Sequence, residues 1–124
     1  MHKYKELKIW QRSVELATSV YSITHKFPKS EQYGLVQQIR RAVVSVSSNI
    51  AEGAGRKSER EFVYFLNIAY GSLYELETQL IISANLGYLA EDKKISVEAE
   101  INELQKMIYT FIKKVNRQSL STQY

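Results

Sequence analysis

The sequence contains no cysteine, one proline and two histidines among its 124 residues. Without cysteine the chain can form no disulfide, no thiol nucleophile and no cysteine-ligated zinc or iron–sulfur site, and this suits a reducing cytoplasm. His2 falls in a terminal segment, and His25 falls at a helix end with no glutamate three residues before it, so the inward Glu-x-x-His pairs of a di-iron bundle are missing. We therefore expect both histidines to lie in solvent and the protein to use no metal and no cofactor.

Long uninterrupted apolar runs are also missing. No segment approaches the roughly 18 apolar residues of a membrane span, and the N-terminal stretch MHKYKELKIWQ lacks the apolar run of a signal peptide. With 44% hydrophobic residues, the chain is instead long enough to bury one core. We expect a single soluble domain in the cytoplasm.

The polar residues form no recognisable catalytic set. In GAGRKS, Arg56 stands where a phosphate loop requires glycine, and no strand precedes it. Ser45, Ser47 and Ser48 have no base nearby in the sequence, and small hydroxyls within a helix more often serve packing than catalysis. The nine tyrosines could stack on bases, but they are spread over every predicted helix, where tyrosine more often fills cores and interfaces. We predict that the protein is not an enzyme.

The turn residues divide the chain into four segments with helical periodicity. Apolar residues spaced three and four apart predict a first helix over Tyr4–Lys26, which Pro28 ends, and a second over Glu31–Glu52. Gly53 and Gly55 follow the second helix, where we expect a left-handed cap.

Two further helices complete the pattern. A capping box, Ser58 with Glu61, precedes a third helix of about 28 residues that Gly87 closes, and the apolar series Val97 to Val115 predicts a fourth. Four amphipathic helices with short turns predict an all-α, antiparallel up-down-up-down four-helix bundle over residues 1–116. The polar tail, residues 117–124, is expected to be disordered.

The first predicted helix has an apolar arc wider than one bundle core requires. Its two stripes lie about 120° apart and consist of Leu7, Trp10, Val14, Ala17 and Tyr21, and of Ile9, Leu16, Val20, Ile23 and Phe27. Either both stripes fill a wide core, or the second is an interface between subunits, because monomers rarely expose so large an apolar patch. We favour the interface. Charging Val20 or Ile23 would then break the oligomer, whereas the same change at a core position would unfold the chain.

Small polar residues form a seam along the second predicted helix, beside its apolar arc. Arg41 and Glu52 would be costly to bury unless paired, so we predict that the seam meets a polar stripe on the third helix. The two sets are Gln38, Arg41, Ser45, Ser48, Asn49, Glu52 and Gly53 on the second helix, and Asn67, Gly71, Glu75 and Thr78 on the third. The favoured interpretation is a device that fixes helix register or a subunit contact; a solvated face is the alternative, and a ligand pocket comes third.

The net charge is only +4, but the predicted topology distributes the charged residues unevenly along the bundle. It brings ten Lys and Arg residues, against four Glu, to the end where the first helix starts, the second meets the third and the fourth finishes. In a cyclic oligomer these ends would form a ring that attracts phosphate backbones without base readout; the alternative is ordinary solubilising charge. The candidate nucleic-acid-binding residues are Lys8, Arg12, Arg56, Lys57, Arg60, Lys113, Lys114 and Arg117.

One stretch carries a family resemblance. It is FPKSEQYGLVQQIRRAVVSVSSNIAEGAGRKSEREFVYFLNIAYGSLYELETQL, with N-I-A-E-G at 49–53 and G-S-L-x-E at 71–75 as its densest motifs. The chain resembles, from Leu7 through the fourth helix, the four-helix-bundle protein family found as reading frames in intervening sequences of bacterial 23S rRNA genes. The resemblance implies a homo-oligomer, typically a pentamer, with no established enzymatic activity.

A related branch of that family comprises accessory proteins of diversity-generating retroelements. It implies a basic surface and two partners, a reverse transcriptase and nucleic acid. Nothing in the sequence separates the two branches. The sequence therefore predicts a non-enzymatic oligomer that binds RNA or DNA through its basic end, and the alternative is a structural or protein-interaction oligomer without nucleic-acid affinity.

Overall fold

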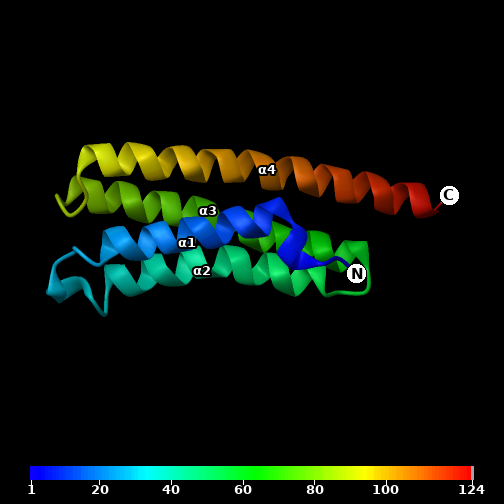
Figure 1. Ribbon diagram of the computed structural model, residues 1–124, viewed down its shortest axis with the longest axis horizontal. Helices are drawn as coiled ribbons and strands as arrows, with labels where there is room; N and C mark the ends of the chain where they lie inside the picture. Colours follow the sequence, from blue (N-terminus) through cyan, green and yellow to red (C-terminus); the bar gives the residue numbers. More distant parts are fainter. Residues whose placement is uncertain (124) are drawn as a thin grey trace.

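The computed structural model describes residues 1–123, with side chains described for residues 1–118, and its elements are helices (Figure 1). The described elements are the α-helices α1 (Lys8–Thr24), α2 (Leu35–Ala54), α3 (Glu59–Asn85) and α4 (Glu91–Gln123), and the short 3-10 helices η1 (Tyr4–Glu6) and η2 (Lys29–Glu31). No strand occurs within these residues. The predicted all-α class is confirmed.

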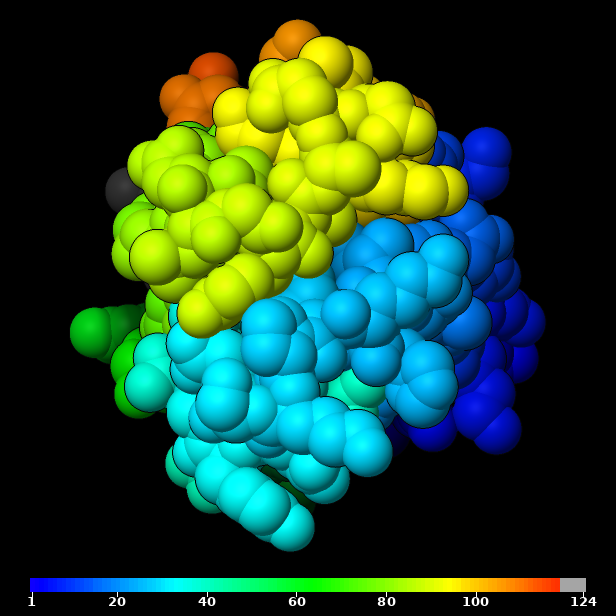
Figure 2. Space-filling model, turned by 90° about the vertical axis from the view of Figure 1, so that its left-hand side faces the viewer, coloured from blue at the N-terminus to red at the C-terminus, as the bar shows by residue number. Residues whose placement is uncertain are grey.

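The helices pack in the order in which they follow one another along the chain. Each contacts its sequence neighbours, and α1 also contacts α4, which closes the bundle, whereas the diagonal pairs of the described helices make no such contact. Figure 1 shows the four helices side by side with connections at alternating ends. The antiparallel four-helix bundle is therefore also confirmed. Figure 2 views the end formed by the α1–α2 connection and the α3–α4 turn.

The core follows the apolar series predicted for the second, third and fourth helices. On α2–α4 the buried side chains include Ile39, Ala42, Val43, Val46, Ile50, Phe62, Leu66, Ala69, Leu73, Leu76, Leu80, Val97, Ile101, Leu104, Ile108 and Val115. Val36 is also buried, and Leu35, Ala84 and Phe111 lie at the edge of the core. Burial of one continuous apolar stripe per helix is what holds such a bundle together.

The rotation of α1 is opposite to the favoured prediction. Leu16 and Val20, in the stripe expected to contact another subunit, are 1% and 0% exposed and belong to the core. Val14 and Tyr21, in the other stripe, are 38% and 42% exposed. We call Leu7, Trp10, Val14, Ala17 and Tyr21 the outer stripe of α1. The second stripe is therefore core, and the outer stripe is only partly covered: Val14 and Tyr21 are exposed, while Leu7, Trp10 and Ala17 pack against the edge of the core.

Two helix ends show how the sequence sets the turns. Ser58 Oγ accepts a hydrogen bond from the Glu61 backbone N–H at 3.1 Å, as the capping box predicts. At the end of α3, Gly87 has a φ of 82°, and Tyr88 N–H donates to the Ser83 carbonyl at 2.9 Å, which is the pattern of a Schellman cap. Gly87 supplies the left-handed conformation there, because other residues adopt it at a steric cost.

The α2–α3 turn differs from its prediction. Among the described glycines, positive φ occurs at Gly87, so the left-handed cap expected at Gly53 or Gly55 is wrong. Gly53 lies inside α2, and a Cβ there would fall 2.8 Å from Phe65 Cβ and 2.9 Å from Phe62 Cδ1. Gly53 is therefore required by close contact between α2 and α3 and not by turn geometry.

The fourth helix is longer than expected. Its backbone continues to Gln123, past residue 116, where the sequence predicts the end of the bundle. Figure 1 shows this part of α4 projecting beyond the other helices. The sequence predicts a disordered tail over residues 117–124, whereas the described backbone is helical to Gln123. The side chains from residue 119 onward lie outside the described residues.

Candidate nucleic-acid interface

The predicted basic end lies where α1 begins, α2 meets α3 and α4 finishes (Figure 1). The ring of Phe62, in the first turn of α3, contacts the ring of Phe111 on α4 with 5.7 Å between centroids. Gly53, near the end of α2, lies against the same Phe62 ring. The residues that follow Phe111 therefore run beside and past the α2–α3 turn.

The N-terminal residues are attached to this turn, so the expectation that His2 lies in solvent is wrong. The His2 backbone N–H donates to the Ala54 carbonyl at 2.8 Å, and ring Nε2 lies 2.9 Å from Glu59 Oε1. The His2 ring also contacts the Phe62 ring with 4.6 Å between centroids. These contacts hold Lys3, the next residue, close to the basic end.

Two of the predicted phosphate-binding arginines are paired with carboxylates. Arg56 Nη2 lies 2.6 Å from Glu52 Oε1, and its guanidinium covers the Phe65 ring at 4.7 Å. Arg12 Nη2 lies 2.9 Å from Glu103 Oε1 on α4, and Arg12 also pairs with a carboxylate of its own helix. Such pairs reduce the positive charge offered to a ligand. Arg12 therefore contributes least to the basic end.

The six other predicted cations form no ion pair within the part of the chain that the structure describes. All six are exposed, and they come from the start of α1, the α2–α3 connection with the first turn of α3, and the later turns of α4: Lys8, Lys57, Arg60, Lys113, Lys114 and Arg117. Three segments far apart in the sequence thus place exposed positive charge at one end of the bundle. We call these six residues the basic end from here on.

A groove of about 520 Å³ joins two of these segments. Lys8 from the start of α1 and Lys114 from α4 both line it, with Lys106 two turns earlier on α4. Its remaining lining is mainly apolar and includes Ile9 and Phe111. The groove shows that the cations of α1 and α4 belong to one continuous surface.

The polar seam of α2 contacts α3 through one hydroxyl pair. Ser45 Oγ lies 2.9 Å from Ser72 Oγ, and Asn49 Nδ2 donates to the Ser45 carbonyl at 2.8 Å. The prediction that Asn67 and Thr78 of α3 contact the seam is wrong, because their side chains donate hydrogen bonds to carbonyls of α3 itself. The hydrogen bond between helices supports a role of the seam in helix register.

The remaining seam residues are not part of this contact. Arg41 is exposed and has no ion pair among the described residues, while Glu52 pairs with Arg56. Glu75 is exposed and accepts a hydrogen bond from Gln79 Nε2 at 3.3 Å. Gly71 is exposed, and a Cβ placed on it would meet no atom within 4 Å.

Three tyrosines form a surface cluster that sequence reasoning missed. The Tyr70 and Tyr74 rings on α3 meet edge to face at 5.2 Å, and their hydroxyls lie 3.1 Å apart. The Tyr109 ring on α4 lies 6.3 Å from that of Tyr70, and Lys113 Nζ lies 5.1 Å from the Tyr109 centroid. The hydrogen bond with Tyr74, together with partial burial, raises the pKa of Tyr70. We call Tyr70, Tyr74 and Tyr109 the tyrosine cluster.

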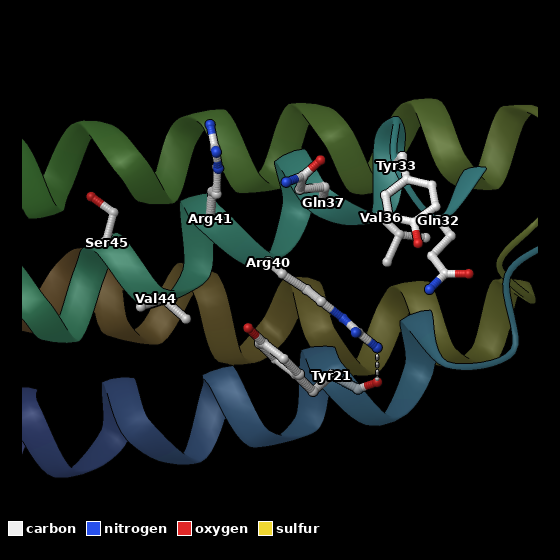
Figure 3. Close-up of a pocket in the computed structure, with 9 residues that line it drawn as sticks. All are labelled: Tyr21, Gln32, Tyr33, Val36, Gln37, Arg40, Arg41, Val44 and Ser45. Atoms are coloured by element: carbon white, nitrogen blue, oxygen red, sulfur yellow. Dashed lines mark hydrogen bonds between the residues drawn. The ribbon is translucent and has the colours of Figure 1, made fainter.

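A second hollow, of about 510 Å³, opens on the α1–α2 face (Figure 3). Arg40 extends across it, with its guanidinium carbon 4.3 Å from the Tyr21 centroid and Nη2 donating to the Tyr21 carbonyl at 3.2 Å. Figure 3 shows that Arg41 extends away from Arg40, toward α3. Because Arg40 is held by α1, its role is to join the two helices.

Other kinds of site were also sought. Within the described residues, no group of three or more His, Asp or Glu side chains is placed to hold a metal ion. His25 is exposed, as expected. None of the described helices is both long and apolar enough to cross a membrane.

Comparison with known proteins gives a family and a structural neighbour. Residues 5–110 match the family model described as 23S rRNA-intervening sequence protein. A crystal structure from Bacteroides thetaiotaomicron, of a protein with unknown function from the S23 ribosomal protein family, shares 24% sequence identity. The match covers 85% of this chain and 95% of that chain with a TM-score of 0.78, and at this identity it shows the fold. No curated protein matches.

Proposed function

The chain belongs to the 23S rRNA-intervening sequence protein family, and from that premise we propose that it is a non-enzymatic homo-oligomer whose basic end binds the phosphates of RNA or DNA. The observation that carries this proposal is the set of six exposed cations at one end, drawn from three chain segments, without ion pairs among the described residues. Clustered Lys and Arg attract phosphate backbones and release their counterions, and this attraction needs no base sequence.

Two of the four carboxylates at this end are paired, while Glu6, which lines the groove, is exposed and has no ion pair among the described residues. Glu52 is engaged by Arg56 and Glu59 by His2, and Glu61 accepts a hydrogen bond from the Ser58 hydroxyl. The first turn of α3 adds the positive end of a helix dipole next to Lys57 and Arg60. The negative end of the α2 dipole lies at the same turn, so the six cations carry the attraction for a phosphate.

The oligomer is proposed to form through the outer stripe of α1. The bundle leaves Val14 and Tyr21 of this stripe 38% and 42% exposed, and apolar stripes of this kind are commonly covered by another subunit. Five copies, the number that the family resemblance implies, would repeat the basic end around an axis. Repetition raises the local potential, so weak phosphate contacts add up to useful affinity.

The proposal places the protein in the cytoplasm with nucleic acid as its partner, and a reverse transcriptase as a second partner if it belongs to the retroelement branch. One observation favours the alternative of a protein-interaction oligomer without nucleic-acid affinity. Tyr33 and Tyr64 are 85% and 63% exposed, and exposed aromatic side chains are typical of protein contacts.

A salt titration tests the proposal. Binding of the full chain to structured RNA, single-stranded DNA and duplex DNA would be measured by fluorescence anisotropy from low to high salt. We expect all three to bind at low salt, with log affinity falling linearly with log salt concentration. The triple charge reversal Lys57→Glu, Arg60→Glu, Lys114→Glu should remove binding to all three alike.

The opposite end supplies the control. Lys26 and Lys29 are exposed there, so Lys26→Glu with Lys29→Glu changes net charge without touching the basic end. If this control weakens binding as much as the reversal at the basic end does, the attraction is a property of net charge and the assigned surface is wrong. No binding to any of the three nucleic acids at low salt would refute the proposal, and light scattering on each variant would show whether the oligomer is retained.

A further inference from the structure

We infer that the tyrosine cluster is a base-stacking platform for single-stranded nucleic acid, continuous with the basic end through Lys113 and Arg117. This inference rests on the proposed function and adds to it a second contact, made with bases. Aromatic side chains stack on bases of any sequence, and stacking combined with a cationic track is the usual way of holding a single strand.

The rings of the cluster are exposed and held in place. Tyr74 and Tyr109 are 48% and 52% exposed, with Lys113 over the Tyr109 ring, while Tyr70 lies half-buried between them. The hydrogen bond between the Tyr70 and Tyr74 hydroxyls fixes one pair of rings before any ligand arrives. Side chains already ordered lose less conformational entropy on binding.

The cations follow the cluster at helical spacing. Tyr109, Lys113 and Arg117 are four residues apart on α4 and therefore lie along one face of that helix. Tyr109 and Arg117 are separated by about 12 Å along the axis, which matches a few nucleotides stacked at about 3.4 Å each. Lys113 rests over the Tyr109 ring, where it could exchange that contact for a phosphate as a base takes its place.

The negative charges lie on the other side of the cluster. On α3, Glu75 and Glu77 follow Tyr74 in the direction away from the basic end, and Asn67, on the side toward the basic end, is uncharged. A phosphate backbone would therefore be attracted toward Lys113 and repelled by the α3 carboxylates beyond Tyr74, where Lys106 is the exposed cation on the α4 side. This asymmetry favours an anionic ligand over an apolar protein segment, and the exposed tyrosine rings favour a nucleic acid among anions, because its bases can stack on them.

A comparison of single-stranded with duplex DNA distinguishes this inference from the proposed function. Paired bases in a duplex are stacked inside the helix and cannot reach a tyrosine, whereas the phosphates of both forms can reach the basic end. We would measure anisotropy with a labelled oligo(dT) of twenty nucleotides and with a twenty-base-pair duplex, at one low salt concentration.

Removing the rings should affect the single strand alone. With Tyr74→Ala and Tyr109→Ala combined, we expect oligo(dT) affinity to fall on the order of tenfold or more, while duplex affinity changes less than about twofold. Tyr109→Phe keeps the ring and should bind oligo(dT) as the wild type does. Tyr64→Ala is the matched control, because Tyr64 is an exposed tyrosine of α3 whose ring contacts Phe65 and not the cluster.

Each contrary result has its own meaning. If the Ala variants bind oligo(dT) like the wild type while the charge reversal at the basic end removes binding, the platform is wrong and the proposed function stands. If neither oligo(dT) nor duplex binds the wild-type protein, the proposed function fails and this inference fails with it. If the Ala variants change the oligomer size in light scattering, the cluster is a subunit contact and the platform is overturned.

Discussion

The hydroxyls of Ser45 on α2 and Ser72 on α3 lie 2.9 Å apart and form the side-chain hydrogen bond that connects these two helices. Asn49 Nδ2 also donates to Ser45 Oγ at 2.9 Å, so the pair belongs to a small network on α2. Small side chains let the helices approach closely, and a directional bond between them favours one helix register over its neighbours.

We predict a measurable coupling between the two serines. In a double-mutant cycle with Ser45→Ala and Ser72→Ala, the interaction free energy should be about 0.5–1.5 kcal/mol. Urea unfolding followed by circular dichroism would measure it. Ser48→Ala, at an exposed position of α2, should stay within about 0.5 kcal/mol of wild type. Strictly additive single mutants would show that the hydrogen bond contributes nothing to stability.

The two glycines of the predicted seam should respond to alanine with opposite signs. Gly53→Ala should lower the free energy of unfolding by about 1–3 kcal/mol, because the new Cβ would lie 2.8 Å from Phe65 Cβ. Gly71→Ala should raise it by about 0.5–1 kcal/mol, because a mid-helix glycine with empty space around it loses entropy on folding for no packing gain.

Chemical denaturation of both variants checks this pair. Destabilisation by Gly71→Ala would mean that a second molecule approaches α3 at Gly71, and light scattering on that variant would then show a smaller oligomer. An unchanged stability for Gly53→Ala would mean that α2 and α3 can separate without cost at this point.

The fold could be predicted because its signals are local. The capping box at Ser58, Pro28 after the first helix and Gly87 after the third each act within a few residues, and the apolar spacing between them specifies helices. Short connections between four amphipathic helices then leave few topologies other than the antiparallel bundle. The same topology explains why cations from three segments could be assigned to one end.

The rotation of α1 could not be predicted, because both of its stripes are apolar and other helices decide which one is buried. The buried face of α1 includes Ser13 and Thr24, whose hydroxyls donate to carbonyls one turn earlier in α1. This local bond lets a polar residue enter the core at little cost. In the sequence the same two residues make the buried stripe look less apolar than it is.

Contacts between helices were missed for a related reason. Tyr70, Tyr74 and Tyr109 come from two helices, and their clustering depends on the rotation of α3 and α4. His2 was expected in solvent because a terminal residue has no local partner, yet it contacts Glu59, fifty-seven residues away. Such pairs carry no periodic signal in a single sequence.

The contact between Tyr88 and Glu31 should make stability depend on alkaline pH. Tyr88 Oη donates to Glu31 Oε2 at 3.1 Å, and this hydrogen bond raises the pKa of Tyr88, with burial and the carboxylate charge adding to the effect. A tyrosine pKa that is higher in the folded than in the unfolded protein contributes stability that is complete below the unfolded value, near 10, and is lost as the pH rises through the folded value.

We therefore expect the wild type to be more stable than Tyr88→Phe at pH 8, with the difference shrinking as tyrosinate forms above pH 10. Urea midpoints of both proteins across this range would measure it. A difference that stays constant to pH 11 would show that the hydroxyl acts through packing and not through the bond to Glu31. Glu31→Gln, which removes the charge and keeps an acceptor, should weaken the pH dependence.

Two valines of α1, six residues apart, separate the core of the subunit from the proposed contact between subunits. Val20 is 0% exposed, so Val20→Lys buries an unpaired charge and should destabilise the fold by about 4 kcal/mol or more. Val14 is 38% exposed, so Val14→Lys should leave a folded, helical chain. If the outer stripe joins the subunits, the same lysine should dissociate the oligomer, because it would be buried at the interface without a partner.

Light scattering and circular dichroism on both variants test whether the outer stripe is the subunit contact. The fluorescence of the chain's tryptophan gives a second signal. The single tryptophan, Trp10, lies on the outer stripe and is partly buried within one subunit. Dissociation should expose Trp10 further and shift its emission to longer wavelength in Val14→Lys without loss of helical signal. A Val14→Lys protein that keeps both the oligomer size and the Trp10 emission of the wild type would place the subunit contact on another face, and the outer stripe would then be a surface that the oligomer leaves open.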